Sequence, residues 1–481
     1  GWNADIFLVV WDTAAQYQWG HTLGGSATDA TAGLVVDQNQ RVWIGGYLVN
    51  AVDLNPDPNF SFNVPGTGGD GFIAAYQVSD GQFFTAHHLD GSAFSRVHNL
   101  AQANNGRIWS VGALYGTANF DVNGGSFSLS SPANNNPNSF FAAYQNSSFD
   151  TAWVTEDRLG GDDYLTHAEF LNDGNIIATG YFQGGIDADP DTSEFFLDSR
   201  GGQDVYLIKY DSNFDLIWAL QMGGINGDQA TVLAEDASGN LYLAGHYSGT
   251  FFYPTSNGLD SLVSQSQLSI FLAKINSQGQ LLWMKDIQGL GNEYAYGLSV
   301  NNQGQVALAG MLQGNISFDG LNTSPNVANR GAFLAVYDSS GSYLWSQIID
   351  GPSNEFGYTC LAADNGDFYL GGSYRNTVDF DPGPAGDSYT SQFGGNDVFL
   401  AKYNSSGQYQ WVKVYGQNSF EGAFALDEDA AGNLYLAGEF SFLQDFNPPN
   451  NDTLRSKGAT DIFKILFLRL IKFICSCSYT I

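Results

Sequence analysis

Oxygen-bearing side chains recur at alternating positions in several short loops, a spacing that suits a hard cation. The candidate ligands are, copy by copy, Asp187, Asp189 and Asp191; Asp53, Asn55 and Asp57; and Asp379 and Asp381. Each copy runs into a Pro-containing bend, which can turn backbone carbonyls toward the same point. Carboxylate, amide and carbonyl oxygens are the ligands that Ca²⁺ prefers. The pattern therefore predicts a Ca²⁺ site in at least one loop, first in the copy that begins at Asp187.

Turn formation is the alternative explanation of the same residues. Asp and Asn before Pro or Gly form Asx-turns that cap a loop bend without any metal. No copy has the twelve-residue spacing of an EF-hand loop that ends in Glu. A repeated motif is also expected wherever the unit that carries it is repeated. Turn formation is the favoured interpretation, and the metal site stays open beside it.

Charge and motif content limit the other chemistries. The 481-residue chain has a formal net charge of −32, which disfavours nucleic acid and anionic lipid as partners. The six histidines have no metal-site spacing, and neither a GxSxG motif nor a phosphate-binding loop is present. No uncharged apolar run is long enough to span a bilayer. We therefore expect no nucleic-acid partner and no stable membrane insertion.

A repeat of about 65 residues organises the chain. One mark is a strand that ends in small residues, as in "VWIGG" and "LYLAG". Its final glycines are Gly46, Gly112, Gly180, Gly245, Gly310, Gly372 and Gly438. A second mark, with the same period, is a large aromatic residue near the end of each unit: Trp19, Phe84, Trp153, Trp218, Trp283, Trp345 and Trp411. Because these aromatics recur at one strand position, we expect them to pack between units rather than to bind sugar.

Each unit contains four short strands separated by Gly- and Asn-rich turns, which predicts an all-β, seven-bladed β-propeller with four antiparallel strands per blade. The chain begins with a third-and-fourth strand pair and ends with a first-and-second pair. Strands from both termini should therefore complete one blade and close the ring. The propeller is assigned to residues 1–463.

Antiparallel strand order places the long loops on one face of such a propeller. The second-to-third loops carry the candidate cation motifs, and the fourth-to-first loops add further acids. Those acids are Asp29, Asp162, Asp163, Asp228, Glu293, Glu355 and Glu421. Loops on a rigid scaffold commonly carry function. We therefore expect this acidic long-loop face to carry the binding activity.

The units resemble the SBBP-type bacterial β-propeller repeat family. The resemblance rests on "GNLYLAG" and "GGNDVFLAKYNSSGQYQWVKVYG" and their sister units, and it covers about residues 3–463. The "VDFDPGP" insert is similar to inserts in surface propellers of Bacteroidota. The resemblance implies a secreted or cell-surface scaffold, and it offers no catalytic residues to carry over.

The end of the chain departs from the repeat. Residues 464–481 read "KILFLRLIKFICSCSYTI", with three basic residues and no acidic one. Three interpretations are open: a basic interfacial anchor, an irregular outer strand from Ile465, or a non-native replacement of the family's continuation. We favour the last.

Together these observations predict a non-catalytic extracellular or cell-surface scaffold. It should be a monomer that binds an extracellular protein or glycan through the acidic long-loop face, as in adhesion, with Ca²⁺ as the one candidate cofactor. The alternative is a carbohydrate-active hydrolase or lyase that uses acidic loop residues around the central channel, because glycoside hydrolysis needs paired carboxylates. Such an enzyme should break the repeat at one cluster of loops, whereas a scaffold should stay nearly uniform.

Overall fold

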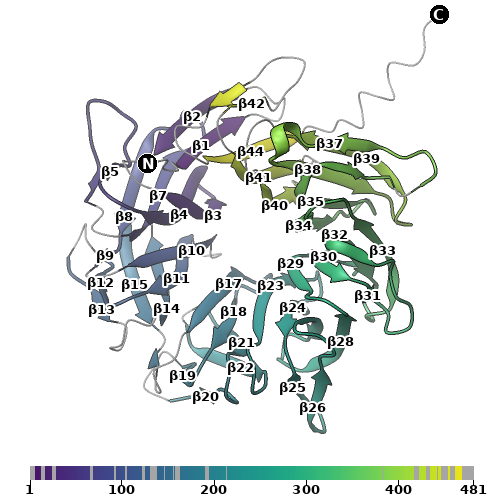
Figure 1. The fold of residues 1–481 in the computed structure, drawn as a ribbon. Coiled ribbons are helices and arrows are strands. Elements are labelled where there is room, and N and C mark those ends of the chain that lie inside the picture. Colours follow the sequence, from purple (N-terminus) through teal and green to yellow (C-terminus); the bar gives the residue numbers. More distant parts are fainter. Residues whose placement is uncertain are drawn as a thin grey trace, which may run out of the picture. The chain divides into compact units, whose positions relative to one another are not determined.

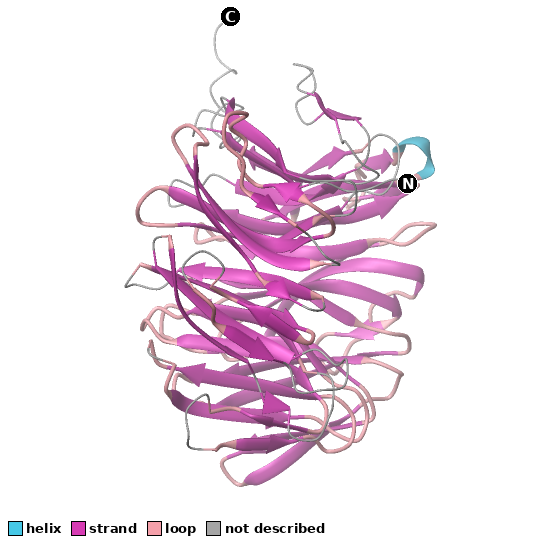
Figure 2. Ribbon diagram, turned by 90° about the vertical axis from the view of Figure 1, so that its left-hand side faces the viewer, coloured by secondary structure: helices cyan, strands magenta, loops and turns pink. Residues whose placement is uncertain are grey.

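A computed structural model of the chain describes 6–11, 17–23, 29–65, 69–91, 94–102, 106–121, 125–130, 138–145, 147–154, 156–157, 163–189, 194–212, 214–381, 383–416, 422–428, 434–440, 443–445, 453–455 and 461–467. These residues form β-strands and turns, with one short 3-10 helix at Gln392–Gly394 (Figure 2). The chain divides into two compact units. The terminal unit comprises 1–22, 296–314 and 325–481, and the central unit comprises 23–295 and 315–324.

The central unit contains four consecutive antiparallel sheets, each with its four main strands in chain order. The first two sheets are β3 (Ala30–Val36), β4 (Arg41–Leu48), β7 (Asp70–Gln77) and β8 (Phe83–His88); and β10 (Ser95–Gln102), β11 (Arg107–Leu114), β14 (Asn138–Gln145) and β15 (Ser148–Val154). The next two are β17 (Tyr164–Phe170), β18 (Ile176–Phe182), β21 (Asp204–Tyr210) and β22 (Leu216–Met222); and β23 (Gln229–Glu235), β24 (Leu241–Tyr247), β27 (Ser269–Ile275) and β28 (Leu281–Gly289). Within this unit the first strands lie on the inner side and the fourth strands on the outer side (Figure 1).

The terminal unit has the same sheet pattern, and its strands β2 and β29 extend one or two residues past its boundary. Its four-stranded sheets are β29 (Tyr294–Val300), β30 (Val306–Gly314), β32 (Val327–Tyr337) and β33 (Tyr343–Ile349); and β34 (Phe356–Ala362), β35 (Phe368–Arg375), β38 (Asn396–Tyr403) and β39 (Tyr409–Tyr415). A further sheet joins β40 (Gly422–Glu428), β41 (Leu434–Phe440) and β44 (Asp461–Phe467), and β1 (Ile6–Trp11) pairs with β2 (Tyr17–Leu23). Four antiparallel strands in chain order form the repeated sheet of β-propeller proteins.

The last sheet differs from the sequence expectation. The N-terminal pair was expected directly beside the strand at Leu434–Phe440, but β44 occupies that place, with Phe463 opposite Gly438. Strand β1 lies beside β44 instead. Lys464–Phe467 therefore belongs to a regular third strand, whereas the rest of the 464–481 tail lies outside the described residues.

The second-to-third connections carry small hairpins, which within the central unit lie on the outer side of the sheets (Figure 1). They are β5 (Val52–Asp53) with β6 (Asn63–Val64); β12 (Thr117–Asn119) with β13 (Ser128–Ser130); β19 (Gly185–Asp187) with β20 (Phe196–Asp198); and β25 (Thr250–Thr255) with β26 (Gly258–Val263). In the terminal unit they are β36 (Thr377–Asp379) with β37 (Ser388–Thr390), and β42 (Leu443–Asp445) with β43 (Thr453–Arg455).

The inserts join consecutive sheets of the central unit. Strand β12 pairs with β9 (Asp90–Gly91), which follows the fourth strand of the preceding sheet. Likewise β19 pairs with β16 (Glu156–Asp157). Strand β31 (Ile316–Ser317), which itself belongs to the central unit, pairs with the end of β28. Each pairing satisfies backbone groups on an otherwise open edge. The inserts are therefore part of the fold, not only surface loops.

Tryptophans of the fourth strands make a second contact between sheets, which confirms the expected packing for two members of the series. Trp218 donates its indole N–H to the Ser277 carbonyl of the next sheet, and Trp345 donates to Ser405 in the same way, both at 3.1 Å. Gly279 has a φ of +78°, and a Cβ there would lie 2.8 Å from the Trp218 ring. The turn therefore requires glycine, both for its backbone conformation and for the close approach of the ring.

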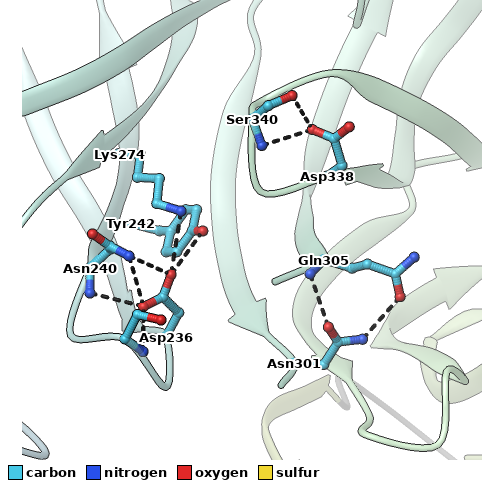
Figure 3. Close-up of polar contacts among 9 residues, drawn as sticks. Asp236, Asn240, Tyr242, Lys274, Asn301, Gln305, Asp338 and Ser340 are labelled. Carbon is cyan, nitrogen blue, oxygen red and sulfur yellow. Dashed lines mark hydrogen bonds and ion pairs between the residues drawn. The ribbon is translucent and has the colours of Figure 1, made fainter. Parts of the chain in front are cut away.

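The tight hairpin turns are closed by Asp or Asn side chains (Figure 3). The Asp236 Oδ1 atom accepts hydrogen bonds from the backbone N–H groups of Ser238 and Asn240, both at 2.9 Å. Its other carboxylate oxygen accepts from the Tyr242 hydroxyl and lies 3.4 Å from Lys274 Nζ. Both partners of this ion pair are buried, and the hydrogen bonds and Lys274 hold the pKa of Asp236 below its ordinary value despite burial.

Candidate functional site

The predicted cation loops are built on a repeated side-chain clamp. Asp53 Oδ1 accepts hydrogen bonds from the backbone N–H of Asn55 at 3.0 Å and of Phe62 at 2.8 Å. Asn55 Oδ1 in turn accepts from the backbone N–H of Asp57 at 3.0 Å. Each alternating side chain thus receives the N–H two residues further on, which is the geometry of an Asx-turn. The side chain at position 53 also fastens the two ends of the insert together.

The same clamp recurs at the other predicted loops. Asp187 Oδ1 accepts from the backbone N–H of Asp189 at 3.0 Å and of Phe195 at 2.9 Å. Asp379 Oδ1 accepts from the backbone N–H of Asp381 at 3.1 Å and of Asp387 at 2.7 Å.

Asn119 occupies the equivalent position in another insert. Its Oδ1 accepts from the backbone N–H of Asp121 at 3.1 Å and of Phe127 at 2.9 Å. Because a neutral amide makes the same contacts, the clamp needs neither a charge nor a metal.

The copies differ in accessibility. Asp187, ranked first by sequence, is buried, whereas Asp53, Asp57 and Asp379 are exposed. Asp191, the third acid of the first copy, lies outside the described residues. Within the described ranges, no group of three or more His, Cys, Asp or Glu residues is arranged to hold a metal ion. Ca²⁺ binding therefore stays a prediction, while turn formation is visible in the hydrogen bonds.

The acids of the fourth-to-first loops are buried, which corrects the expectation that they form part of an exposed acidic face. Asp29, Asp163, Asp228, Glu293 and Glu355 are each no more than 1% exposed. Asp162 and Glu421 lie outside the described residues.

Asp228 illustrates the hydrogen bonds that the acids of the fourth-to-first loops accept. Its Oδ2 accepts from the Gly224 N–H at 2.7 Å, and its Oδ1 accepts from the Ser248 N–H at 3.2 Å. Asp29 accepts from the Val49 N–H at 2.7 Å in the same way. These carboxylates therefore tie the fourth-to-first loop to the end of the second strand.

Burial changes the acid strength of these groups. Desolvation raises the pKa of Asp228 and of Glu293 to about 7, and that of Glu355 to about 8. Hydrogen bonds from backbone N–H groups oppose the rise in all three cases but do not cancel it. The shifts resemble those of catalytic acids, yet the side chains are closed off from solvent and used within the fold.

At one position of the first strands the residue type changes between the two units. Sequence reasoning did not identify this position. Each of the first strands β10, β17 and β23 has a β-bulge, at His98, Thr166 and Thr231. These side chains contact the first strand of the next sheet: His98 Nδ1 lies 3.0 Å from the Leu165 carbonyl, Thr166 donates to the Ala230 carbonyl at 3.0 Å, and Thr231 donates to the Ala295 carbonyl at 2.9 Å. At these three bulges the side chain therefore links neighbouring strands.

In the terminal unit aromatic residues occupy this position. Tyr358 and Phe424 are the bulge residues of β34 and β40, and Tyr296 is the matching residue of β29, three positions after the buried acid. The Tyr358 ring lies 5.7 Å from that of Tyr296 and 4.8 Å from that of Phe424, between centroids. Phe356 stacks on Tyr358 at 5.5 Å with the planes only 3° apart. We call Tyr296, Phe356, Tyr358 and Phe424 the aromatic ladder.

The ladder is open to solvent in part, and a cation lies at its edge. Phe424 is 43% exposed, and the other three side chains are half-buried. The Arg330 guanidinium is exposed and lies 5.8 Å from the Phe356 ring centroid. When the repeats are aligned on their buried acids, the sequence shows aromatic residues at this first-strand position. Their exposure follows only from the β-bulge, which turns the side chains out of the sheet.

No helix in the described ranges is long and apolar enough to cross a membrane.

Comparison with known proteins gives distant similarities. No protein-family model matches the chain. An uncharacterized WD repeat-containing protein of Acanthamoeba polyphaga mimivirus is 23% identical over 231 residues, which cover 42% of this chain and 16% of that protein. The regulatory protein FlaEY of Caulobacter vibrioides is 28% identical over 218 residues, covering 43% of this chain and 22% of FlaEY. The matches thus span less than a quarter of either relative.

Solved structures show a similarly weak likeness. Quinohemoprotein alcohol dehydrogenase from Comamonas testosteroni has 10% identity and a TM-score of 0.44, over 97% of this chain and 74% of that one. The WD40 repeats of RRP9 have 9% identity and a TM-score of 0.37, over 91% of this chain and 92% of the other. WD repeats are propeller units, so the sequence similarity to a WD repeat-containing protein agrees with the β-propeller type of sheet described above.

Proposed function

We propose that the chain is a non-catalytic extracellular or cell-surface scaffold that binds protein or glycan, with Ca²⁺ assisting at the insert loops. The proposal includes a seven-bladed ring of SBBP type, closed by strands from both termini. In this arrangement the sheets are a rigid frame and the long loops carry the binding surface.

The observation that carries the proposal is the reuse of the same contacts from sheet to sheet. The insert clamp recurs at Asp53, Asn119, Asp187 and Asp379. A catalytic centre would instead single out one cluster of ionisable side chains that reach a substrate. Such uniformity is what a scaffold requires, because each repeat contributes an equivalent, independently braced loop.

The buried acids argue against the alternative of a hydrolase or lyase. Asp204 and Asp228 interact electrostatically, and the pKa of each is raised, as in a pair of catalytic carboxyl groups. However, both residues are 0% exposed. Asp204 accepts from Gln221 at 2.7 Å, and Asp228 holds two backbone N–H groups. A substrate would have to displace the loops to reach them.

Thermal unfolding with and without Ca²⁺ tests the metal part of the proposal. The full chain is melted in EDTA, then with Ca²⁺ added back, with Mg²⁺ as the control ion. A ligand that binds only the folded state at 100 times its Kd adds about 2.7 kcal/mol to the unfolding free energy. A saturable rise in Tm with Ca²⁺ alone supports the proposal, whereas identical melts in EDTA and Ca²⁺ would overturn it.

Asp-to-Asn variants locate the ion. Asp57→Asn and Asp381→Asn keep an acceptor oxygen, as Asn119 does naturally, but remove a negative charge. The Ca²⁺-dependent rise should shrink in the variant of the loop that binds. A reduction of equal size in Asp338→Asn, a hairpin-turn control outside the insert loops, would indicate a general charge effect instead.

Binding to immobilised neutral and anionic glycans and to extracellular matrix proteins tests the scaffold function. We expect retention of the full chain on at least one surface, reduced by EDTA and by the same loop variants. Release of hydrolysed or unsaturated sugar products by the purified chain would contradict the non-catalytic assignment.

A further inference from the structure

We propose that the aromatic ladder of the terminal unit, with Arg330 at its edge, is a stacking site for a neutral glycan chain. The inference rests on the proposed function in taking a glycan as the partner, and it places that partner on the first strands instead of the insert loops. No residue of the ladder belongs to the predicted cation loops or to the clamps.

The ladder is continuous across three neighbouring first strands. Strands β29 and β34 lie close, because Ser299 Oγ accepts from the Ala362 N–H at 3.1 Å and a Cβ at Gly297 would lie 2.9 Å from Thr359 Cα. At the next step, from β34 to β40, a Cβ at Gly422 would lie 3.4 Å from the Tyr358 ring. Gly297 and Gly422 therefore lie at positions where a neighbouring strand or ring leaves little room for a side chain. The rings are consequently held at fixed separations by the sheet backbones.

The aromatic side chains replace a structural contact, which argues that they serve another purpose. At the same bulge position, Thr166 and Thr231 donate hydrogen bonds that fasten adjacent first strands. Phenylalanine at position 424 has no donor for such a bond. A buried packing role does not explain the exchange either, because Phe424 is 43% exposed. A bulge that turns an aromatic face toward solvent is a feature found next to binding sites.

The chemistry of the ladder matches a sugar chain. Pyranose rings have apolar C–H faces that stack on aromatic faces, and hydroxyl groups that need donors and acceptors. Tyr296 and Tyr358 supply phenol groups beside the stacking faces, and the exposed Arg330 supplies N–H donors at the edge.

Charge decides between neutral and anionic glycans. The chain carries a formal net charge of −32, which repels acidic polysaccharides at low ionic strength. Among the described residues, Arg330 is the one cation shown against a ladder ring, that of Phe356. One guanidinium does not provide the array of cations that repeated carboxylates or sulfates require. The occupant that fits is therefore an uncharged glycan, with an apolar protein segment as the competing outcome of the test.

Affinity electrophoresis of the full chain through gels containing soluble neutral polysaccharides tests the site. The probes are a mixed-linkage β-glucan, a xyloglucan and a mannan, with alginate as the anionic comparison. We expect retardation by at least one neutral polymer but not by alginate. Phe424→Ala should weaken the interaction about tenfold, which corresponds to the loss of one stacking contact. Leu344→Ala is the matched control, because Leu344 is 42% exposed but lies on the fourth strand β33, outside both the ladder and the insert loops.

A second variant guards against simple unfolding. Phe424→Trp keeps and enlarges the aromatic face, so it should retain binding, and a change in its tryptophan fluorescence on adding the retarding polysaccharide should report stacking directly. Tm and circular dichroism establish that each variant is folded. Equal retardation of the wild type and a folded Phe424→Ala variant would overturn the inference.

The outcomes separate this inference from the proposed function. Glycan binding that depends on the insert loops and is abolished by EDTA, but not by Phe424→Ala, would refute the ladder and leave the scaffold function standing. Retention only on extracellular proteins would do the same. Binding that resists EDTA and is lost in Phe424→Ala would support the ladder without any role for Ca²⁺. If neither glycans nor proteins are retained, both proposals fail.

Discussion

The buried Glu355 should make the chain less stable as pH rises, and Glu355→Gln should remove part of that dependence. The side chain is 0% exposed, and desolvation raises its pKa from an ordinary value of 4.5 to about 8. The neighbouring Asp350 raises the pKa further, while the backbone N–H groups of Arg375 and Gly351 oppose the rise. Folding therefore favours the protonated acid.

The direction and size follow from the two pKa values. Below about pH 4.5 the acid is protonated in both the folded and the unfolded chain and costs no stability. Between about pH 4.5 and 8 the unfolded chain ionises first, so the folded state loses stability with every rise in pH. At about 1.36 kcal/mol per pKa unit, and with each titration only partly complete at the ends of the range, the loss between pH 5 and pH 8 is about 3.5 kcal/mol. Above pH 8 the loss stays constant.

Urea unfolding at pH 5 and at pH 8 measures this loss. Glutamine keeps the size of the side chain and cannot ionise. We expect the urea midpoints of wild type and Glu355→Gln to agree near pH 5, and the variant to be more stable at pH 8. The slope of the unfolding free energy against urea concentration (the m-value) should not change. Asp319→Asn is the control, because Asp319 is exposed and its pKa is lowered to about 2, outside this range. If wild type and Glu355→Gln lost the same stability between the two pH values, the assignment of the pH dependence to Glu355 would be wrong.

Three further predictions concern the contacts that hold the sheets together. Trp218→Phe keeps the ring but loses the 3.1 Å hydrogen bond to the next sheet, so the unfolding free energy should fall by about 1 kcal/mol in urea melts. Gly279→Ala should lower Tm more than Gly106→Ala, because both glycines have positive φ but only Gly279 contacts an aromatic ring; equal losses would contradict this. Asp236→Asn removes the carboxylate charge that lies 3.4 Å from the buried Lys274 Nζ and should cost about 3–5 kcal/mol at pH 7. Because the pKa of Asp236 is lowered, this contribution is present above pH 4 and lost as pH falls further, so acid titration of wild type and variant should converge.

The sequence by itself determined the elements that depend on local pattern. The recurring small-residue marks at Gly180 and Gly245, which lie two residues before the ends of β18 and β24, and the recurrent aromatics predict the order of strand, turn and insert in each repeat. Strand alternation and Asx-turns involve residues only a few positions apart, so one unit contains the information for its own hydrogen bonds. The packing of Trp218 against the next sheet could likewise be anticipated, because an aromatic residue recurs at this position in every repeat.

Only the tertiary structure decided which of the recurring acids face solvent and which face the fold. Asp187 and Glu355 read as loop acids like any others, yet strand pairing between consecutive sheets and loop closure bury them. The aromatic ladder likewise joins Tyr296, Tyr358 and Phe424 from three strands about 60 residues apart, which local propensity does not bring together. Sheet-to-sheet packing and the direction of each β-bulge set these contacts, and both arise from non-local geometry.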